Sequence, residues 1–344
     1  MGRLSDGVLP DLRLPRLVGG REAARTPMRA AVAAALLASL VTVLPAAAQP
    51  APAPGAAVRA PADMAPPSTA QLTREQRAQE LEAAWEAAHD AATPGPASIP
   101  LLGQATLQVP AGMEFIPHDE AQRLSRAGGN TPGPDLLGFV NPLADSSLWL
   151  AAVRFEDSGH VSDAEADQLD AAALLAGLRE GTAESNKDRV ERGFPEMELT
   201  GWSQPPAYDA STRLLTWALR YRLSGAAGED SGLNYNTRVL GRDGYFSINL
   251  LSSPSRLEAD RAEAAPLLAG LRYLDGKRYE DFSAGIDRVA AVGLAGLIGV
   301  VAAKKIGIIA LVGAFLLKFA KVGVLAVLGL GVAAKRLFRR APRA

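Results

Sequence analysis

The chain has 344 residues, a formal net charge of −1 and no cysteine. This balance gives no sign of nucleic-acid binding, and without cysteine there are no disulfides, no cysteine lipidation and no thiol chemistry. We therefore expect no nucleic-acid partner.

The N-terminal region is typical of an exported bacterial protein. Residues 1–27 are polar, basic and unpatterned, and we interpret them as a mis-called extension before Met28. Residues 28–48 resemble a signal peptide, with an apolar run over Ala30–Leu44 and a small-residue cleavage site at Ala46–Ala48. The alternative is an uncleaved N-terminal anchor, although the apolar run is short for a membrane span.

A linker and a helix come next. Residues 49–69 are rich in Pro and Ala, which is typical of an extended linker. Residues 70–98 carry apolar side chains at helical spacing before Pro94. This pattern predicts one amphipathic helix over Gln71–His89, with Trp85 packed on the domain that follows.

Residues 99–285 are long enough to form a domain with its own core. Short runs rich in β-branched, aromatic and other apolar residues predict six strands. They are Ala105–Val109, Leu148–Phe155, Leu199–Trp202, Leu214–Leu223, Leu233–Leu240 and Tyr245–Leu251. Gly241–Gly244, between the last two, is a hairpin signal.

Two helices are predicted in the same domain. Asp163–Glu184 has leucines on one face and acids on the other, and Ser255–Leu271 begins with the capping-box pair Ser255 and Glu258. Hairpins with a few helices indicate an α+β fold. We expect an antiparallel sheet domain of about six strands with flanking helices, followed by a C-terminal α-helical transmembrane region.

That region, residues 286–334, holds three apolar blocks separated by lysines: Val289–Ala303, Ile306–Leu317 and Val322–Ala334. Each block is shorter than the ~20 residues that cross a bilayer, so at least one crossing must include lysine. The basic residues 335–344 predict a cytoplasmic tail. With an exported domain, this favours a single crossing. A hairpin of two crossings is the alternative.

Two patterns in this tract predict contacts with the lipid bilayer or a helix partner. Three lysines fall within roughly 100° of one another on a continuous helix and predict a polar stripe, unless they only mark membrane interfaces. They are Lys304, Lys318 and Lys321. Small residues at every fourth position predict close helix association, unless they only reflect the Ala/Gly-rich composition. They include Ala291, Ala295, Gly299 and Ala303.

The best candidates for binding a ligand or partner lie near the predicted hairpin. Asn234, Asn236 and Arg238 share one side of a strand and predict either a polar cleft or a solvated strand face. Arg242 lies in the hairpin turn, and Tyr208 and Asp209 are candidates that also fit a turn before a strand. No motif predicts catalytic residues, a cofactor or a metal site.

Several phrases in the domain, in their order, carry a resemblance. They include Gly159-His160-Val161, Gly193-Phe194-Pro195, Gly201-Trp202, Leu233-Asn234-Tyr235-Asn236, Leu240-Gly241-Arg242-Asp243-Gly244 and Gly276-Lys277-Arg278-Tyr279-Glu280-Asp281-Phe282. From about Leu101 onward the chain resembles the uncharacterised bacterial membrane-anchored family called domain of unknown function 2167. The resemblance implies an exported domain with a C-terminal anchor and no assigned activity. It also implies that His160, where the family usually has Tyr, is no catalytic base or metal ligand.

The segment Gly276–Phe282 joins the domain to the apolar tract. Tyr279 and Phe282 are expected either at the bilayer interface or packed on the domain. We expect a protein of the bacterial inner membrane whose main domain is periplasmic or otherwise extracytoplasmic. Its domain would be a binding module. A membrane-tethered envelope hydrolase or transferase, or a channel component, are the alternatives.

Overall fold

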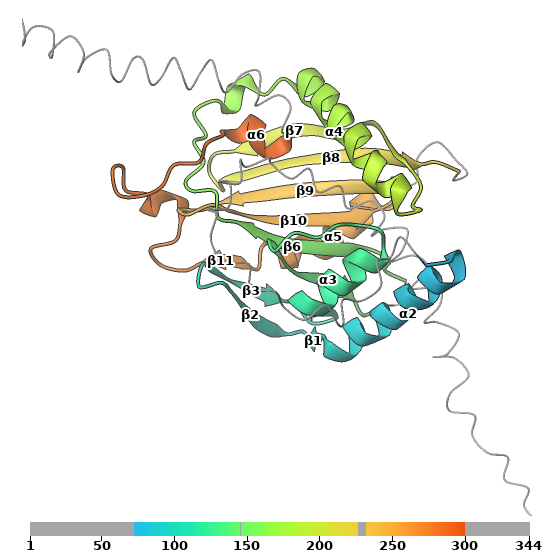
Figure 1. Ribbon diagram of the computed structural model, residues 1–344. Helices are drawn as coiled ribbons and strands as arrows, with labels where there is room; N and C mark the ends of the chain where they lie inside the picture. Colours follow the sequence, from blue (N-terminus) through green and yellow to red (C-terminus); the bar gives the residue numbers. More distant parts are fainter. Residues whose placement is uncertain (1–71, 145, 226–231, 300–344) are drawn as a thin grey trace, which may run out of the picture.

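The structure is a computed structural model that describes residues 72–144, 146–225 and 232–299 (Figure 1). The predicted extension, signal peptide and linker of residues 1–69 lie outside these residues. So do Ala303, Lys304, Lys318, Lys321 and the basic tail.

Within the described residues, the chain forms helices and strands in a mixed order. The helices are α2 (Arg74–Ala91), α3 (His118–Ala127), α4 (Ala171–Glu191), α5 (Leu257–Leu268) and α6 (Leu294–Ile298), with 3-10 turns η2 (Ala166–Gln168) and η3 (Tyr279–Asp281). The strands are β1 (Thr93–Pro94), β2 (Ala97–Leu101), β3 (Ala105–Val109), β4 (Met113–Pro117), β5 (Leu136–Pro142), β6 (Leu150–Glu156), β7 (Met197–Asp209), β8 (Leu214–Leu223), β9 (Gly232–Leu240), β10 (Tyr245–Ser252) and β11 (Leu271–Tyr273).

The strands form two antiparallel sheets. The large sheet has the order β1-β4-β5-β6-β10-β9-β8-β7, and the small one has the order β11-β3-β2 (Figure 1). In the large sheet β6 pairs with β10, although the two strands are far apart in sequence. The predicted α+β antiparallel sheet domain with flanking helices is confirmed.

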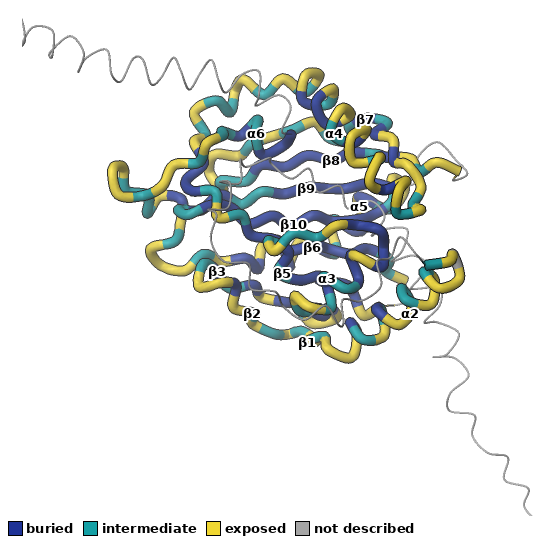
Figure 2. The backbone as a smooth tube through the Cα atoms, in the orientation of Figure 1, coloured by how far each residue is buried: buried dark blue, intermediate teal, exposed yellow. Residues whose placement is uncertain are grey.

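The large sheet is covered on both faces. One face packs against the small sheet and α5 in a cluster that includes Leu107, Phe246 and Leu267. The other face carries two separate apolar clusters. One lies beneath α2 and α3, and the other lies beneath α4 and α6. The central strands are buried along most of their length (Figure 2).

Strand β10 shows how the sequence fits this position. All eight of its residues are buried. Phe246, Ile248 and Leu250 point to the side of the small sheet, whereas Tyr245 and Leu251 join the two clusters on the helical side. Burial of every residue is typical of a strand covered on both faces, and here it includes the polar Ser247 and Asn249 on the helical side.

The predicted strands and the hairpin match observed elements. The six predicted runs lie within or overlap β3, β6, β7, β8, β9 and β10, and Leu240 pairs with Tyr245 across the predicted turn. Strands β1, β2, β4, β5 and β11 were not predicted. Neither was helix α3. Trp85 packs against the cluster beneath α2 and α3, as expected.

Two helix boundaries differ from prediction. Helix α4 begins at Ala171 rather than Asp163, because the Asp170 side chain accepts hydrogen bonds from the backbone N–H groups of Ala172 and Ala173 and caps the helix there. The capping box predicted for Ser255 and Glu258 is wrong. Helix α5 begins at Leu257 after Arg256, without a side-chain cap.

Residues 286–299 differ from the predicted membrane region. Val289 forms a parallel bridge with His160, and the short helix α6 is packed against α4 through Leu294, Leu297 and Ile298. These apolar side chains complete the domain core. Among the described residues, none of the helices has the length and apolar character needed to cross a bilayer.

The predicted stripe of small residues is also corrected where it is described. Ala291 is exposed and precedes the helix, Ala295 lies within it, and Gly299 follows its end. Gly293 and Gly299 both have extended backbone conformations, so these positions do not lie on one continuous helix. They therefore cannot form a single helical face.

Candidate functional site

A polar region separates the two apolar clusters on the helical side of the large sheet. The register places Arg154 of β6 opposite Ser247 of β10, and Ser247 opposite Arg238 of β9. The next row aligns Asn249 with Asn236, and Asn236 with Trp217 of β8. Because alternate residues of a strand share a face, these polar side chains gather on one surface.

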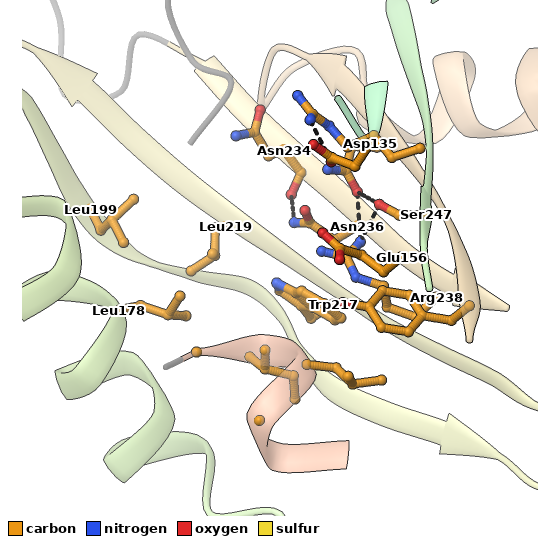
Figure 3. A pocket seen from close by; sticks show the side chains of 17 residues that line it. Asp135, Glu156, Leu178, Leu199, Trp217, Leu219, Asn234, Asn236, Arg238 and Ser247 are labelled. Carbon is orange, nitrogen blue, oxygen red and sulfur yellow. Dashed lines mark hydrogen bonds and ion pairs between the residues drawn. The ribbon is translucent and has the colours of Figure 1, made fainter. Parts of the chain in front are cut away.

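This surface forms a pocket of about 70 Å³. It is lined by strands β6, β8, β9 and β10, by Asp135 just before β5, and by Gly296–Gly299 at the end of α6 (Figure 3). Leu178, Leu199 and Leu219 supply an apolar wall on the α4 side. Drug-sized ligands occupy pockets of about 300–1,000 Å³. The pocket is therefore sized for a small group or the end of a larger molecule.

The predicted face of β9 lines this pocket. Asn236 Nδ2 donates a hydrogen bond to the Asn234 carbonyl at 3.1 Å, and Arg238 reaches across to β10. Arg238 Nη1 donates to Ser247 Oγ at 2.8 Å and to Asn249 Oδ1 at 2.9 Å (Figure 3). The hypothesis of a polar cleft is thus favoured over a solvated strand face for Asn234, Asn236 and Arg238.

Two aromatic rings hold the Arg238 guanidinium. Its central carbon lies 4.9 Å from the Trp217 ring centroid and 5.8 Å from that of Tyr245. Both distances suit cation–π attraction. Burial, together with the neighbouring positive charge of Arg154, lowers the pKa of Arg238, and burial raises the pKa of Tyr245 to about 12. Arg238 remains a cation at neutral pH.

Arg154 is the most deeply buried charge in the pocket. Its side chain is 4% exposed, and its Nη1 donates to Asp135 Oδ2 at 2.8 Å. Its Nε and Nη2 atoms are also buried and have no hydrogen-bond partner among the described residues. Asp135 Oδ1 is likewise buried and has no hydrogen-bond partner among the described residues. A buried polar atom without a hydrogen bond reduces the stability of the fold. These atoms therefore mark a candidate binding site.

Glu156 lies two residues beyond Arg154 on the same face. Its carboxyl group makes no hydrogen bond to the described part of the chain, and the side chain is partly buried. Burial raises the pKa of Glu156, and the negative charge of Asp135 raises it further. Arg238 and Arg154 partly offset this shift. The pocket thus contains two arginines and two acids, which balance in formal charge.

Three other predicted binding residues lie elsewhere. Tyr208 OH donates to Asp163 Oδ2 at 2.8 Å, and Asp209 accepts from the Ser211 backbone. Both end strand β7, rather than forming a turn before a strand. Arg242 forms a two-point ion pair with Asp287. None of the three lines the pocket.

Arg242 belongs to a contact that holds residues 276–289, which we term the clasp, against the end of the sheet. The His160 ring lies between Tyr279, at 4.2 Å, and Phe282, at 3.9 Å. Tyr279 is buried and donates to the Val161 carbonyl at 3.0 Å. Tyr279 and Phe282 therefore pack on the domain, which was the second of the two expectations for them.

The polar and charged pocket residues that the sequence analysis missed include Asp135, Arg154, Glu156, Ser247 and Asn249. One signal was available. Arg154 interrupts an apolar strand that is otherwise typical of a buried one, and a charge in such a position needs a partner. Within the described residues, no group of three His, Asp or Glu side chains is arranged to hold a metal ion.

The comparisons with known proteins agree with the resemblance. The family model described as "Protein of unknown function (DUF2167)" matches residues 93–330, which is more than half of the chain. The chain belongs to the DUF2167 family. The matched range begins at β1 and includes every strand and every residue that lines the pocket.

Among solved structures, the solution structure of cyanobacterial PsbP (CyanoP) from Synechocystis sp. PCC 6803 is similar to this DUF2167 protein. The TM-score is 0.32 and the identity 11%, over 53% of this chain and 91% of that chain. No curated protein matches the chain in sequence. What the comparisons establish is therefore the family, whose function is unknown.

Proposed function

We propose that this DUF2167 protein is a membrane-anchored cell-envelope protein whose domain binds a small polar group of a ligand or partner in the pocket beside Arg154 and Arg238. The domain would lie on the extracytoplasmic side of the inner membrane. The apolar tract from Ile306 to Ala334 and the basic tail that follows would supply the anchor.

The observation that carries the binding role is the arrangement of Arg154. A guanidinium that is 4% exposed, with two donor atoms lacking protein partners, lines a pocket together with amides from neighbouring strands. Arg242, by contrast, donates from both Nε and Nη2 to the Asp287 carboxylate. Concave sites with a few converging polar groups are typical of ligand sites.

The test is native mass spectrometry of the full-length protein extracted in mild detergent from bacterial membranes. We expect a bound small molecule on the natural chain that is lost in Asn236→Leu, since leucine has a similar shape but removes the amide from the pocket. The control is Gln108→Leu, which changes an exposed amide on β3, in the small sheet. Equal adducts on both variants, or none on the natural chain, would contradict the proposal.

Glu156 favours a second candidate, a membrane-tethered hydrolase or transferase. A partly buried carboxyl group with a raised pKa in a pocket suits general acid–base catalysis. Against it, Ser247 Oγ contacts Arg238 and Asn249 rather than a base. Glu156→Gln would abolish turnover of envelope esters or glycosides if this candidate were correct. Turnover that survives in the folded variant would exclude Glu156 as the catalyst.

A further inference from the structure

The Nε and Nη2 atoms of Arg154, which form one edge of its guanidinium and have no hydrogen-bond partner among the described residues, indicate the negatively charged part of a ligand. In this chain, Arg123 uses its Nε and Nη2 atoms to bind both carboxylate oxygens of Glu80, at 2.9 and 3.2 Å. Arg242 uses the same two atoms on Asp287, at 2.9 and 2.7 Å. In Arg154 this edge has no protein partner within the described residues. Its planar geometry matches a carboxylate or a phosphate, bound through two oxygens.

The acids of the pocket identify the other half. Asp135 Oδ1 is buried without a hydrogen-bond partner among the described residues, and the partly buried Glu156 carboxyl group also lines the pocket. Both lie in the same pocket as the Arg154 edge. Ionised carboxylates accept hydrogen bonds and do not donate them, so these two groups require a donor. A ligand with only an oxyanion would leave them unmatched and would be repelled by them.

The charge balance of the pocket also indicates a ligand that carries both a negative and a positive group. Arg154 and Arg238 offset Asp135 and Glu156, so the pocket does not favour an ion of either sign overall. Glu156 follows Arg154 by two residues on the same face, which separates their Cα atoms by about 6–7 Å. A compact ligand that carries both charges can therefore meet both groups at once.

We propose that the pocket binds a zwitterionic group in which an oxyanion and an ammonium are a few bonds apart. The oxyanion binds the Nε–Nη2 edge of Arg154, and the ammonium faces Asp135 and Glu156. This inference rests on the proposed binding role of the pocket. A free α-amino acid and a phosphoethanolamine headgroup share this chemistry, and the small pocket volume of about 70 Å³ suits either group.

The test is calorimetric titration of the full-length protein in detergent. The probes are glycine and glycerophosphoethanolamine, the phosphodiester of the lipid headgroup, as zwitterions, acetate and inorganic phosphate as oxyanions, and ethylamine as an ammonium. We expect a zwitterion to bind at least tenfold more tightly than any probe that carries one charge type. Whichever zwitterion binds more tightly identifies the source, an amino acid or a lipid headgroup.

Two variants separate the halves of the site. Arg154→Lys keeps the charge but loses the two-point edge, and we expect it to weaken zwitterion binding at least tenfold. Glu156→Gln should narrow the preference for the zwitterion over the oxyanion, because only Asp135 then faces the ammonium. The matched control is Arg123→Lys, the same change at an ion pair away from the pocket, which should leave binding unchanged. Melting curves verify folding. If Arg154→Lys fails to fold, the near-isosteric Glu156→Gln still tests whether the pocket recognises the ammonium of the ligand.

Two results would overturn the inference. If the oxyanions bind the natural protein as tightly as the zwitterions, the acids play no part in recognition, while the pocket remains a binding site as proposed. If none of the probes binds, the zwitterion assignment is wrong. The native mass spectrometry described above then decides separately whether the pocket binds another ligand.

Discussion

Single residues set the electrostatic properties of the pocket, and Glu156 is the clearest case. Its neighbours on strand β6 are a buried arginine and an aromatic core residue, Phe155. Burial and the charge of Asp135 raise the pKa of Glu156 above its ordinary value of 4.5. The folded state therefore holds this proton more tightly than the unfolded state, and the site carries a cost in stability once the group ionises.

We predict that Glu156→Gln makes the protein more stable than the natural chain at pH 7. With a raised folded pKa, the favourable contribution of Glu156 is fully present below about pH 4.5 and is lost as the pH rises through the folded pKa. Glutamine does not ionise, so the advantage should shrink as the pH falls through the folded pKa of Glu156 and should be gone below about pH 4.5. Melting temperatures from circular dichroism across this range measure it. Glu258→Gln, at an exposed position, is the control. A variant less stable than the natural chain at pH 7 would refute the argument.

Two glycines show that the same substitution can act in opposite directions. A Cβ atom at Gly244, in the β9–β10 turn, would lie 1.9 Å from the Glu156 carbonyl oxygen, which is backbone and cannot rotate away. Gly181 lies inside α4 with open space around it. We predict that Gly244→Ala destabilises the protein by about 1–3 kcal/mol and that Gly181→Ala stabilises it by about 0.5–1 kcal/mol. Urea unfolding measures both changes, and shifts of the same sign would contradict the geometry.

At the scale of elements, the clasp joins the end of the domain to strands β9 and β10. Arg242 binds Asp287, Lys277 binds Asp243 at 2.7 Å, and the His160 ring is held between two aromatic rings. Burial lowers the pKa of His160, while the nearby Asp163 and Asp287 act to raise it and Arg213 acts to lower it. The folded protein therefore favours the neutral imidazole.

We predict that His160→Phe reduces the loss of stability on mild acidification. Below about pH 6.5, the ordinary pKa of histidine, the unfolded chain takes up a proton that the folded chain resists, so the natural protein loses stability as the pH falls. Phenylalanine keeps the aromatic stacking and cannot be protonated. The change in melting temperature between pH 7.5 and 5.5 should be smaller in the variant. An equal change in both proteins would show that His160 does not contribute.

The elements also show which features the sequence predicts. Strand β8 and the β9–β10 hairpin were predictable because their apolar runs end at Gly-rich turns. Strand β4 was missed because Glu114 is buried within it and proline ends it, and β5 because Gly138 and Asn141 interrupt its apolar residues. Alternation along β9 indicated a polar face. The partners on β6 are about 80 residues earlier, and no local pattern encodes the pairing of β6 with β10.

At the scale of the whole molecule, the pocket and the proposed anchor are close along the chain. Gly299 lines the pocket, and Ile306 begins the apolar block that we assign to the membrane. The connection of about seven residues spans at most ~25 Å when fully extended. A pocket tethered within that distance of a bilayer meets lipid headgroups at high local concentration. This geometry favours phosphoethanolamine over a free amino acid as the zwitterion.

The membrane arrangement itself is the last prediction, and the absence of native cysteine makes it direct. Single cysteines at Ala183, exposed on α4, and at Ala344 would be the only thiols in the chain. We predict that a membrane-impermeant thiol reagent labels Ala183→Cys in spheroplasts and labels Ala344→Cys only after lysis, because the basic tail should remain in the cytoplasm. Labelling of both in intact spheroplasts would indicate two crossings. Protection of Ala183→Cys would place the domain in the cytoplasm and remove the extracytoplasmic role, while leaving the chemistry of the pocket to be tested there.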